Sequence, residues 1–283
     1  MAHIKHMFFT LLIIVIAVYM LIMLTMFAFQ RKLMYVPETT ILEPLHYGIE
    51  NVSVLPLISE DKTAIEAWHI AASDSHPLIV YYHGNAGHIG DRMAKISHFV
   101  AAGFGVLAVS YRGYGNSKGL PSEAGLYSDA RTTLNHAIKE FNVPPARILL
   151  YGESLGTGIA TQMAKEMADA NTPVAGLILE APYTSVARRS QEMYPFLPAY
   201  YLAKDKYHTI DKIGDIQCPL MIFHGEKDTV IPVHHGRELF AKASEPKVVH
   251  YFESVDHSSF DYPTLAQHIV DFANAHGLVV TSE

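Results

Sequence analysis

The sequence predicts an α/β fold in which helices cover both faces of a mostly parallel central sheet. Three observations support this prediction. Short apolar segments suited to strands alternate with helical patterns over most of the chain. A serine lies between such a strand and such a helix, in the segment Gly152–Gly156 (GESLG). Further polar clusters follow other predicted strands, at the sheet edge where sites form in this architecture.

The first predicted element is an apolar segment, Phe8–Phe29, that contains no charged residue. As a helix it spans about 33 Å, enough for the ~30 Å hydrocarbon core of a bilayer. A cleavable signal peptide normally has a shorter apolar region, and a buried helix is rarely apolar on every face. We therefore predict a single-pass membrane anchor over residues 1–32 and a second domain over residues 33–283.

The charges that flank this segment bear on its orientation. Lys5 and the α-amino group precede the segment, whereas Arg31 and Lys32 follow it directly. The pair beside the C-terminal end favours a cytoplasmic location for the second domain under the positive-inside rule.

The elements of the second domain follow from local patterns. Tyr35–Pro37 begins an extended link, and Val52–Leu57 and Ala64–Ile70 are expected to form a hairpin. The continuous apolar run Leu78–Tyr82 predicts a central strand that is covered on both faces. The later elements are a helix to Ala102, strand Val106–Ser110, helix Ser122–Phe141, strand Ile148–Tyr151, a helix from Ser154, strands Gly176–Glu180 and Pro219–Phe223, helix His234–Ala243, strand Lys247–Phe252 and helix Tyr262–Ala275.

Composition excludes several classes of function. The net charge of −7 and the lack of a long Lys/Arg run argue against a nucleic-acid partner. The single cysteine, Cys218, excludes an internal disulfide framework and a cysteine-based metal cluster. The 17 histidines include no H-E-x-x-H or comparable ligand spacing. We therefore expect neither a metal ion nor a cofactor.

Ser154 is the predicted nucleophile. A serine on a sharp strand-to-helix turn adopts a strained backbone, and Gly152 and Gly156 relieve crowding by the neighbouring strand and helix. A second G-x-S-x-G, Gly115–Gly119, lies several residues beyond its strand, with Pro121 where a helix would already run. Ser117 is therefore interpreted as a loop residue.

A nucleophilic serine needs donors for the oxyanion that forms during acyl transfer. Gly84 follows a predicted strand and lets the backbone approach a reacting carbonyl. We predict that the backbone N–H groups of Asn85 and Leu155 form the oxyanion hole. His83, in the same loop, is interpreted as structural, because a catalytic base is expected later in the chain.

The acid and the base are expected near the C-terminus. Asp228 follows a strand and precedes a helix start marked by proline, whereas Glu226, its competitor, lies nearer the strand. His257 follows the last strand and completes the order Ser154, Asp228, His257 that this sheet architecture favours. Asp256 beside it is expected at the surface or in hydrogen bonds within the loop.

Five separated motifs resemble those of the α/β-hydrolase superfamily, in particular its ABHD-type branch of membrane-anchored serine hydrolases. The resemblance implies the α/β-hydrolase fold, with Ser154 as nucleophile, Asp228 as acid, His257 as base, and Asn85 and Leu155 as oxyanion donors. It extends over roughly residues 35 to 276. The motifs are HGNAG (83–87), YRGYGNSKGLPSEAGLYSDA (111–130), GESLGTG (152–158), HGEKDTVIP (224–232) and DH (256–257).

The substrate class is less well defined by the sequence. The segment 183–216 contains an apolar, aromatic-rich run, Met193–Leu202, that is interpreted either as a small lid over an acyl chain or as ordinary core packing. Together with the anchor, it favours a lipid-like ester or thioester. The alternatives are a serine peptidase on the same fold and a non-catalytic, membrane-tethered binding module.

Overall fold

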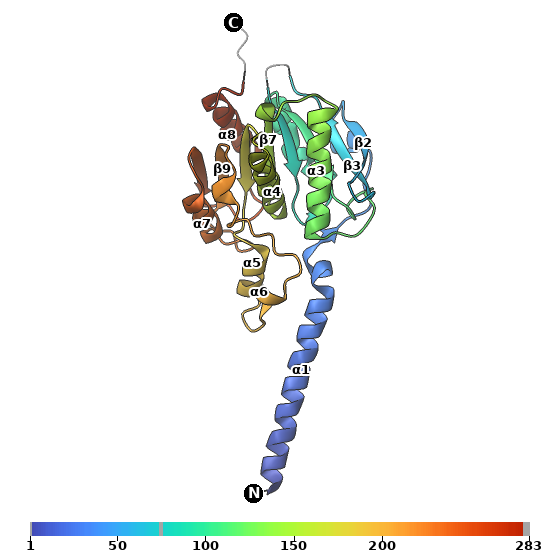
Figure 1. Cartoon of the computed structure of the whole chain (residues 1–283), viewed down its shortest axis with the longest axis vertical. Coiled ribbons are helices and arrows are strands. Elements are labelled where there is room, and N and C mark those ends of the chain that lie inside the picture. The colour runs from blue at the N-terminus through green and yellow to red at the C-terminus, as the bar shows by residue number, and fades with distance from the viewer. Residues whose placement is uncertain (1, 74–75, 280–283) are drawn as a thin grey trace.

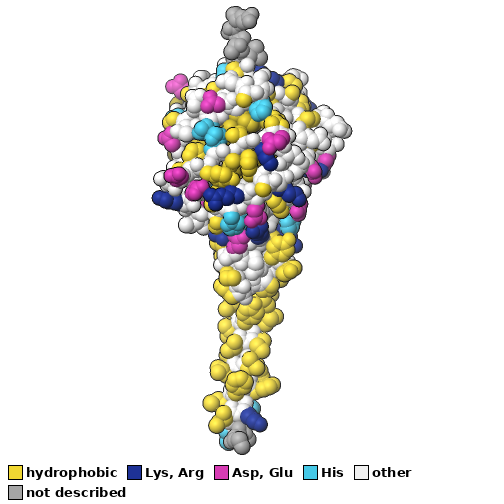
Figure 2. Space-filling model, turned by 90° about the vertical axis from the view of Figure 1, so that its left-hand side faces the viewer, with side chains coloured by type: hydrophobic (Ala, Val, Ile, Leu, Met, Phe, Trp, Pro, Cys, Tyr) yellow, Lys and Arg dark blue, Asp and Glu magenta, His cyan; other side chains and the backbone are white. Residues whose placement is uncertain are grey.

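A long helix projects from the domain that carries the sheet (Figure 1). The computed structural model describes residues 2–73 and 76–279 of the chain. The helix α1 (Ala2–Met34) carries exposed apolar side chains along most of its length (Figure 2). Within the described residues, it is the one helix long and apolar enough to cross a membrane. The predicted apolar segment Phe8–Phe29 is thus helical, and the helix continues beyond residue 32.

The sheet is mostly parallel, as predicted. Its strands are β2 (Ser53–Ile58), β3 (Ala64–Ile70), β4 (Leu78–Tyr82), β6 (Gly105–Ser110), β7 (Ile148–Glu153), β8 (Gly176–Glu180), β9 (Leu220–Gly225) and β10 (Lys247–Phe252). They lie in the order β10-β9-β8-β7-β4-β6-β3-β2. The pairs β2–β3 and β3–β6 are antiparallel, so the predicted hairpin forms, and the other pairs are parallel.

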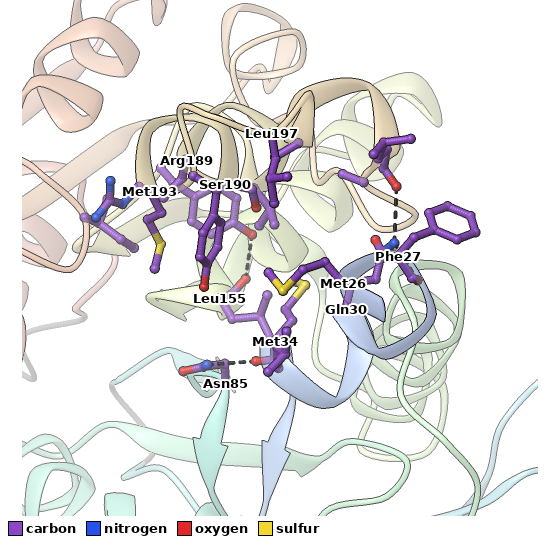
Figure 3. Close-up of a pocket in the computed structure, with 18 of the residues that line it drawn as sticks. Met26, Phe27, Gln30, Met34, Asn85, Leu155, Arg189, Ser190, Met193 and Leu197 are labelled. Carbon is purple, nitrogen blue, oxygen red and sulfur yellow. Dashed lines mark hydrogen bonds between the residues drawn. The ribbon is translucent and has the colours of Figure 1, made fainter. Parts of the chain in front are cut away.

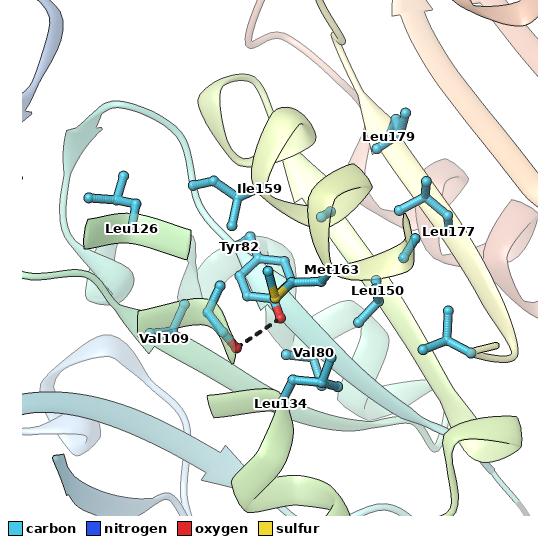
Figure 4. Close-up of a cluster of buried hydrophobic side chains, with 14 of the residues drawn as sticks. Val80, Tyr82, Val109, Leu126, Leu134, Leu150, Ile159, Met163, Leu177 and Leu179 are labelled. Atoms are coloured by element: carbon cyan, nitrogen blue, oxygen red, sulfur yellow. Dashed lines mark hydrogen bonds between the residues drawn. The ribbon is translucent and has the colours of Figure 1, made fainter. Parts of the chain in front are cut away.

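Helices cover both faces of this sheet. One face packs against α3 (Glu123–Lys139), α4 (Leu155–Asp169) and α7 (His234–Lys242), and the other packs against α2 (Met93–Ala101) and α8 (Tyr262–Ala275). Successive residues of β4 alternate between these two cores because side chains along a strand point to opposite faces. Figure 4 shows Val80 and Tyr82 of β4 facing Leu134 of α3 and Met163 of α4. Each such fully buried side chain stabilises the fold by about 1.5–3 kcal/mol.

The thiol of Cys218 lies in the first of these cores. Cys218 is 7% exposed, and burial raises the pKa of its thiol to about 12. The side chain is therefore a neutral packing group.

Short elements connect α1 to the sheet edge where the site lies. β1 (Val36–Pro37) follows α1 directly and pairs in parallel with β5 (Ala86–Gly87), in the loop after β4. This pair was not predicted, because two residues show no periodicity. The remaining short helices are the 3-10 segments η1 (Pro44–Tyr47), η2 (Ile89–Arg92), η3 (Pro145–Arg147) and η4 (Ile213–Asp215).

The segment 183–216 divides into a projecting middle and buried ends. Tyr183, Tyr207 and Ile213 are buried in the core. Between them, α5 (Val186–Met193) and α6 (Ala199–Leu202) project from the domain on the same side as α1 (Figure 1). We call residues 186–203 the cap. The packed ends anchor the cap to the core. The run Met193–Leu202 lies in the cap, where Met193, Phe196 and Tyr201 are exposed, so the interpretation of this run as ordinary core packing is wrong. Its role as a lid stays a prediction.

Candidate active site

Ser154 lies on a tight turn between β7 and α4. Its backbone has φ 49° and ψ −113°, a region that side-chain-bearing residues rarely adopt. A Cβ atom at Gly152 would lie 2.5 Å from the carbonyl oxygen of Gly156, and one at Gly156 would overlap the carbonyl oxygen of Tyr82. Both glycines are thus required for the turn to pack against its own helix and against β4.

The structure brings together the three side chains that were selected from the sequence. His257 Nε2 lies 2.9 Å from Ser154 Oγ, and His257 Nδ1 lies 2.7 Å from Asp228 Oδ2. Ser154 and Asp228 precede His257 by 103 and 29 positions in the chain. A serine hydroxyl, an imidazole and a carboxylate in this order can transfer the hydroxyl proton to the imidazole and stabilise the resulting imidazolium.

Asp228 is held in its ionised form. Its side chain is fully buried, and Oδ1 accepts hydrogen bonds from the backbone N–H groups of Val230 and Ile231 at 2.9 and 2.7 Å. Burial alone raises the pKa of this carboxyl group, but contacts from His224 and His257 and the N–H of Ile231 outweigh burial and hold the pKa below its usual range. The carboxylate can therefore orient His257.

Both residues predicted for the oxyanion hole line the same cavity as Ser154. Leu155 begins α4, where N–H groups of the first turn lack helical acceptors. Among the described residues, no backbone acceptor is found for the N–H of Asn85 or of Leu155. The Asn85 side chain donates to the carbonyl oxygen of Met34 at 2.8 Å, and the backbone carbonyl oxygen of Asn85 accepts from the N–H of Val36 at 2.9 Å. The end of α1 and the start of β1 thus hold the Asn85 loop in place.

His83 and Ser117, for which no catalytic role was predicted, have structural contacts. Burial, followed by the charge of nearby Arg92, lowers the pKa of His83 to about 3, and its ring donates to the carbonyl oxygen of Gly84. Ser117 Oγ donates to the carbonyl oxygen of Ser110 at 2.7 Å and accepts from the N–H of Glu66 at 2.9 Å. Both bonds hold the Ser117 side chain in its loop, as predicted for the second G-x-S-x-G motif.

Glu226, the competitor of Asp228, and Asp256, the neighbour of His257, have other contacts. Glu226 pairs with Arg237 at 2.7 Å. Asp256 is exposed and accepts the N–H groups of Ser258 and Ser259, each at 3.0 Å. It therefore lies at the surface and also shapes the loop that carries His257.

A buried charged cluster beneath the nucleophile was not predicted. Lys95 Nζ lies 2.7 Å from Glu180 and 3.0 Å from Glu153, the residue that precedes Ser154. Arg92 binds the same Glu153 carboxylate at 3.0 Å, and the N–H of Ser154 donates to the backbone carbonyl of Glu180 at 2.9 Å. The sequence carried one signal of this cluster, because Glu153 and Glu180 each end an apolar strand. Buried charges are almost always paired, so two such carboxylates indicate a buried cation nearby.

A cavity of about 290 Å³ opens beside Ser154, at the lower end of the range for ligand pockets. Its walls come from α1, the cap and the loops around Ser154 (Figure 3). Figure 3 shows Met26 and Met34 of α1 on one side, and Met193 and Leu197 of the cap on the other. Arg189 is the one charged residue among the described residues that line it. Such a lining suits a long apolar group attached to a reacting carbonyl.

Two groups of side chains have the composition of metal ligands. Glu192 with His234 and His235 form one, and Glu38 with His88 and Asp91 form the other. Neither group contributes to the cavity beside Ser154. The Glu192 carboxylate already binds both histidines, at 3.2 and 3.0 Å. We therefore assign neither group a role in the chemistry.

Known proteins resemble this chain in sequence. A sequence model of the serine aminopeptidase S33 family matches residues 73–209. An uncharacterized protein of Mycobacterium tuberculosis is 33% identical over 223 residues, which cover 77% of this chain and 76% of that protein. The lysophosphatidylserine lipase ABHD12 of Danio rerio is 36% identical over 188 residues, which cover 61% of this chain and 49% of that lipase. The chain thus spans about half the length of the fish lipase.

Solved structures resemble it in fold. The esterase Pf2001 of Pyrococcus furiosus matches with a TM-score of 0.69, over 86% of this chain and 97% of that protein. The two are 16% identical, so the likeness is one of fold.

Proposed function

Because this chain belongs to the α/β-hydrolase superfamily, in its ABHD-type branch of serine hydrolases, we propose that it hydrolyses an acyl ester or thioester of a lipid-like molecule. One observation carries the proposal: the Ser154–His257–Asp228 chain of hydrogen bonds ends at an apolar cavity. The reactive hydroxyl and a site for a fatty acyl group are thus adjacent.

The proposed reaction has two acyl-transfer steps. His257 Nε2 takes the proton of Ser154 as Oγ attacks the acyl carbonyl, and Asp228 stabilises the imidazolium. The N–H groups of Asn85 and Leu155 stabilise the tetrahedral oxyanion. Collapse breaks the bond to the alcohol or thiol, which takes the proton from His257. Water then transfers a proton to His257 and attacks the acyl-enzyme, which releases the fatty acid and restores Ser154.

The lipid-like substrate is supported by the cavity and by one relative. The cavity offers methionine, leucine and aromatic side chains to the acyl group, and each methylene transferred from water contributes about 0.8 kcal/mol. The Danio rerio relative bears the name of a lysophosphatidylserine lipase, an enzyme acting on a lipid with one acyl chain. A monoacyl lipid has one acyl chain to place in this cavity.

We further propose that α1 anchors the catalytic domain to a membrane as a single-pass span. The apolar surface of α1 supports this, since exposed apolar side chains in water are unfavourable. The division into an anchor over residues 1–32 and a catalytic domain over residues 33–283 stays a prediction. Arg31 and Lys32 favour the cytoplasmic side for that domain.

A peptidase is the second candidate, because the matching family model bears the name serine aminopeptidase. An aminopeptidase must bind the α-ammonium group of its substrate. Among the described residues, no carboxylate lines the cavity, and Arg189 would repel a cation there. An unpaired ammonium in an apolar site is strongly disfavoured.

Turnover by the full chain in phosphatidylcholine vesicles distinguishes these candidates. We expect a palmitoyl ester of nitrophenol to be hydrolysed at least about a hundredfold faster than a leucyl anilide, because the apolar cavity offers no partner for the ammonium group of the anilide. Preference for the anilide would favour the peptidase. If neither compound reacts and a fluorophosphonate leaves no adduct, the protein is a membrane-tethered binding module.

A further inference from the structure

One face of α1 packs against the rest of the protein. Met23, Met26, Gln30 and Met34 are half-buried, and they follow one another at spacings of three or four residues. This spacing defines a single stripe along a helix. Leu21 is 63% exposed and lies on the opposite side by the helical period. The helix therefore has a protein-facing side and a free side, although both are apolar.

Polar contacts hold this face to the cap and to the segment that follows it. Gln30 donates to the carbonyl oxygen of Leu202 at 3.2 Å and accepts from the N–H of Lys204 at 2.6 Å. Arg31 binds both oxygens of Asp205, at 2.7 and 2.9 Å, and this carboxylate is 4% exposed. A bidentate pair of this kind is geometrically specific. The position of α1 relative to the cap is thus defined by directed bonds and by apolar packing.

The same face forms a wall of the cavity that contains Ser154. Met23, Met26, Phe27 and Met34 of α1 line it, and Figure 3 shows Met26 and Met34 opposite the cap. Met34 marks the reactive end, because its carbonyl oxygen accepts from Asn85. Met23 lies about 16 Å farther along the helix, at 1.5 Å per residue. The helix therefore borders the cavity from the reactive end toward the membrane-spanning part.

The cap reaches the depth of the apolar segment. Tyr19 donates to the carbonyl oxygen of Phe196 at 2.9 Å. Tyr19 precedes Phe29, the end of that segment, by about 15 Å of helix. Phe196 and Tyr201 are 65% and 79% exposed, which is unfavourable in water for aromatic rings. If α1 spans a bilayer, these rings lie in the hydrocarbon and headgroup layers.

We propose that α1 is part of the acyl-binding site, and that the acyl chain of a bilayer lipid reaches Ser154 laterally, between α1 and the cap. Met23, Met26 and Phe27 contact the acyl chain and limit its length. A chain on this route passes from one apolar environment to another, so it avoids the cost of exposing methylene groups to water. The proposal rests on the proposed lipid-ester hydrolysis.

The test is substitution of Met26 by tryptophan in the full chain, in phosphatidylcholine vesicles. We expect kcat/KM for a palmitoyl nitrophenyl ester to fall at least about tenfold, since the larger ring fills the acyl site. The acetyl ester, which does not reach Met26, is expected to react at the wild-type rate. Leu21→Trp is the matched control, and it should leave both rates unchanged because Leu21 faces away from the cavity.

Fluorophosphonate labelling separates the outcomes. A wild-type protein that takes no label and hydrolyses neither ester refutes the proposed function, and with it this proposal. If all variants take the label and hydrolyse the acetyl ester, but Met26→Trp and Leu21→Trp hydrolyse the palmitoyl ester equally, only the role of α1 is refuted. If Met26→Trp takes no label, the variant is misfolded, and Met23→Trp, on the same wall of the cavity, replaces it with the same expected loss of palmitoyl turnover.

The depth of the cap is tested by fluorescence. The chain has one tryptophan, Trp68, which is buried in β3 and serves as the internal control. In vesicles of lipids brominated along the acyl chain, we expect strong quenching of the added fluorescence of Phe196→Trp and little quenching of the wild type. Equal quenching of both proteins would refute lateral access.

Discussion

Ser154→Ala is expected to abolish both the covalent fluorophosphonate adduct and the hydrolysis of acyl esters. Loss of the hydroxyl removes the atom that attacks the carbonyl, and in serine hydrolases such a loss costs on the order of a millionfold in kcat. Here Ser154 Oγ is the hydroxyl within 2.9 Å of His257. Intact mass after labelling and initial rates on a nitrophenyl ester measure the two effects.

The matched control is Ser117→Ala, in the second G-x-S-x-G of the same chain. Ser117 Oγ is engaged with Ser110 and Glu66, so this variant should keep the adduct and most of the activity. An adduct that persists in Ser154→Ala and disappears in Ser117→Ala would reverse the assignment of the nucleophile.

Lys95→Ala is expected to destabilise the fold by about 3–5 kcal/mol at neutral pH, because it leaves buried carboxylates without their cation. Burial alone lowers the pKa of Lys95, but the carboxylates of Glu153 and Glu180 outweigh burial and raise it. The ammonium group is thus retained at neutral pH. Urea unfolding of the full chain in detergent micelles measures the loss, with Ser154 labelling as a check on the native site.

The loss should depend on pH in a defined direction. Burial raises the pKa of Glu153, but Lys95, Arg92 and Tyr81 outweigh it and hold the pKa below its usual range. The ionised form of Glu153 therefore stabilises the wild type above the unfolded pKa of about 4.3, and this contribution disappears as the pH falls through the lowered value. The difference in the free energy of unfolding between the wild type and Lys95→Ala should therefore become smaller at acid pH.

Lys165→Ala is the control for this second prediction. Lys165 pairs with Asp169 one helical turn away at the surface, where such pairs contribute little. Its stability should match that of the wild type at every pH. Equal effects of the two lysine variants would contradict a role for the buried cluster.

The sequence by itself determined the local elements and the residues that meet at the sheet edge. β3, β4, β8 and α8 have the predicted bounds, because apolar periodicity and turn residues are local signals. Ser154, Asp228 and His257 were selectable because each follows a strand, and the carboxyl ends of parallel strands share one edge. The three residues could therefore be selected together although they lie far apart along the chain.

Only the tertiary structure decided which partners neutralise buried charges. Lys95 lies on a helix far in sequence from Glu153 and Glu180, and no spacing rule connects the three residues. The short β1–β5 pair, which connects the end of α1 to the Asn85 loop, is likewise too short for a local signal. Contacts of this kind depend on how whole elements pack, and a single sequence does not encode them in a local pattern.

The role of α1 separates most clearly what the sequence determined from what only the tertiary structure decided. Its uniform hydrophobicity predicted a membrane anchor, and the same uniformity concealed the side that faces the protein. Met23, Met26 and Leu21 are all apolar, and their different exposure comes from what lies next to them in space. In water an apolar stripe against a polar face identifies the buried side, but a helix surrounded by lipid needs no polar face. Packing against the cap therefore decided which residues of α1 border the candidate active site.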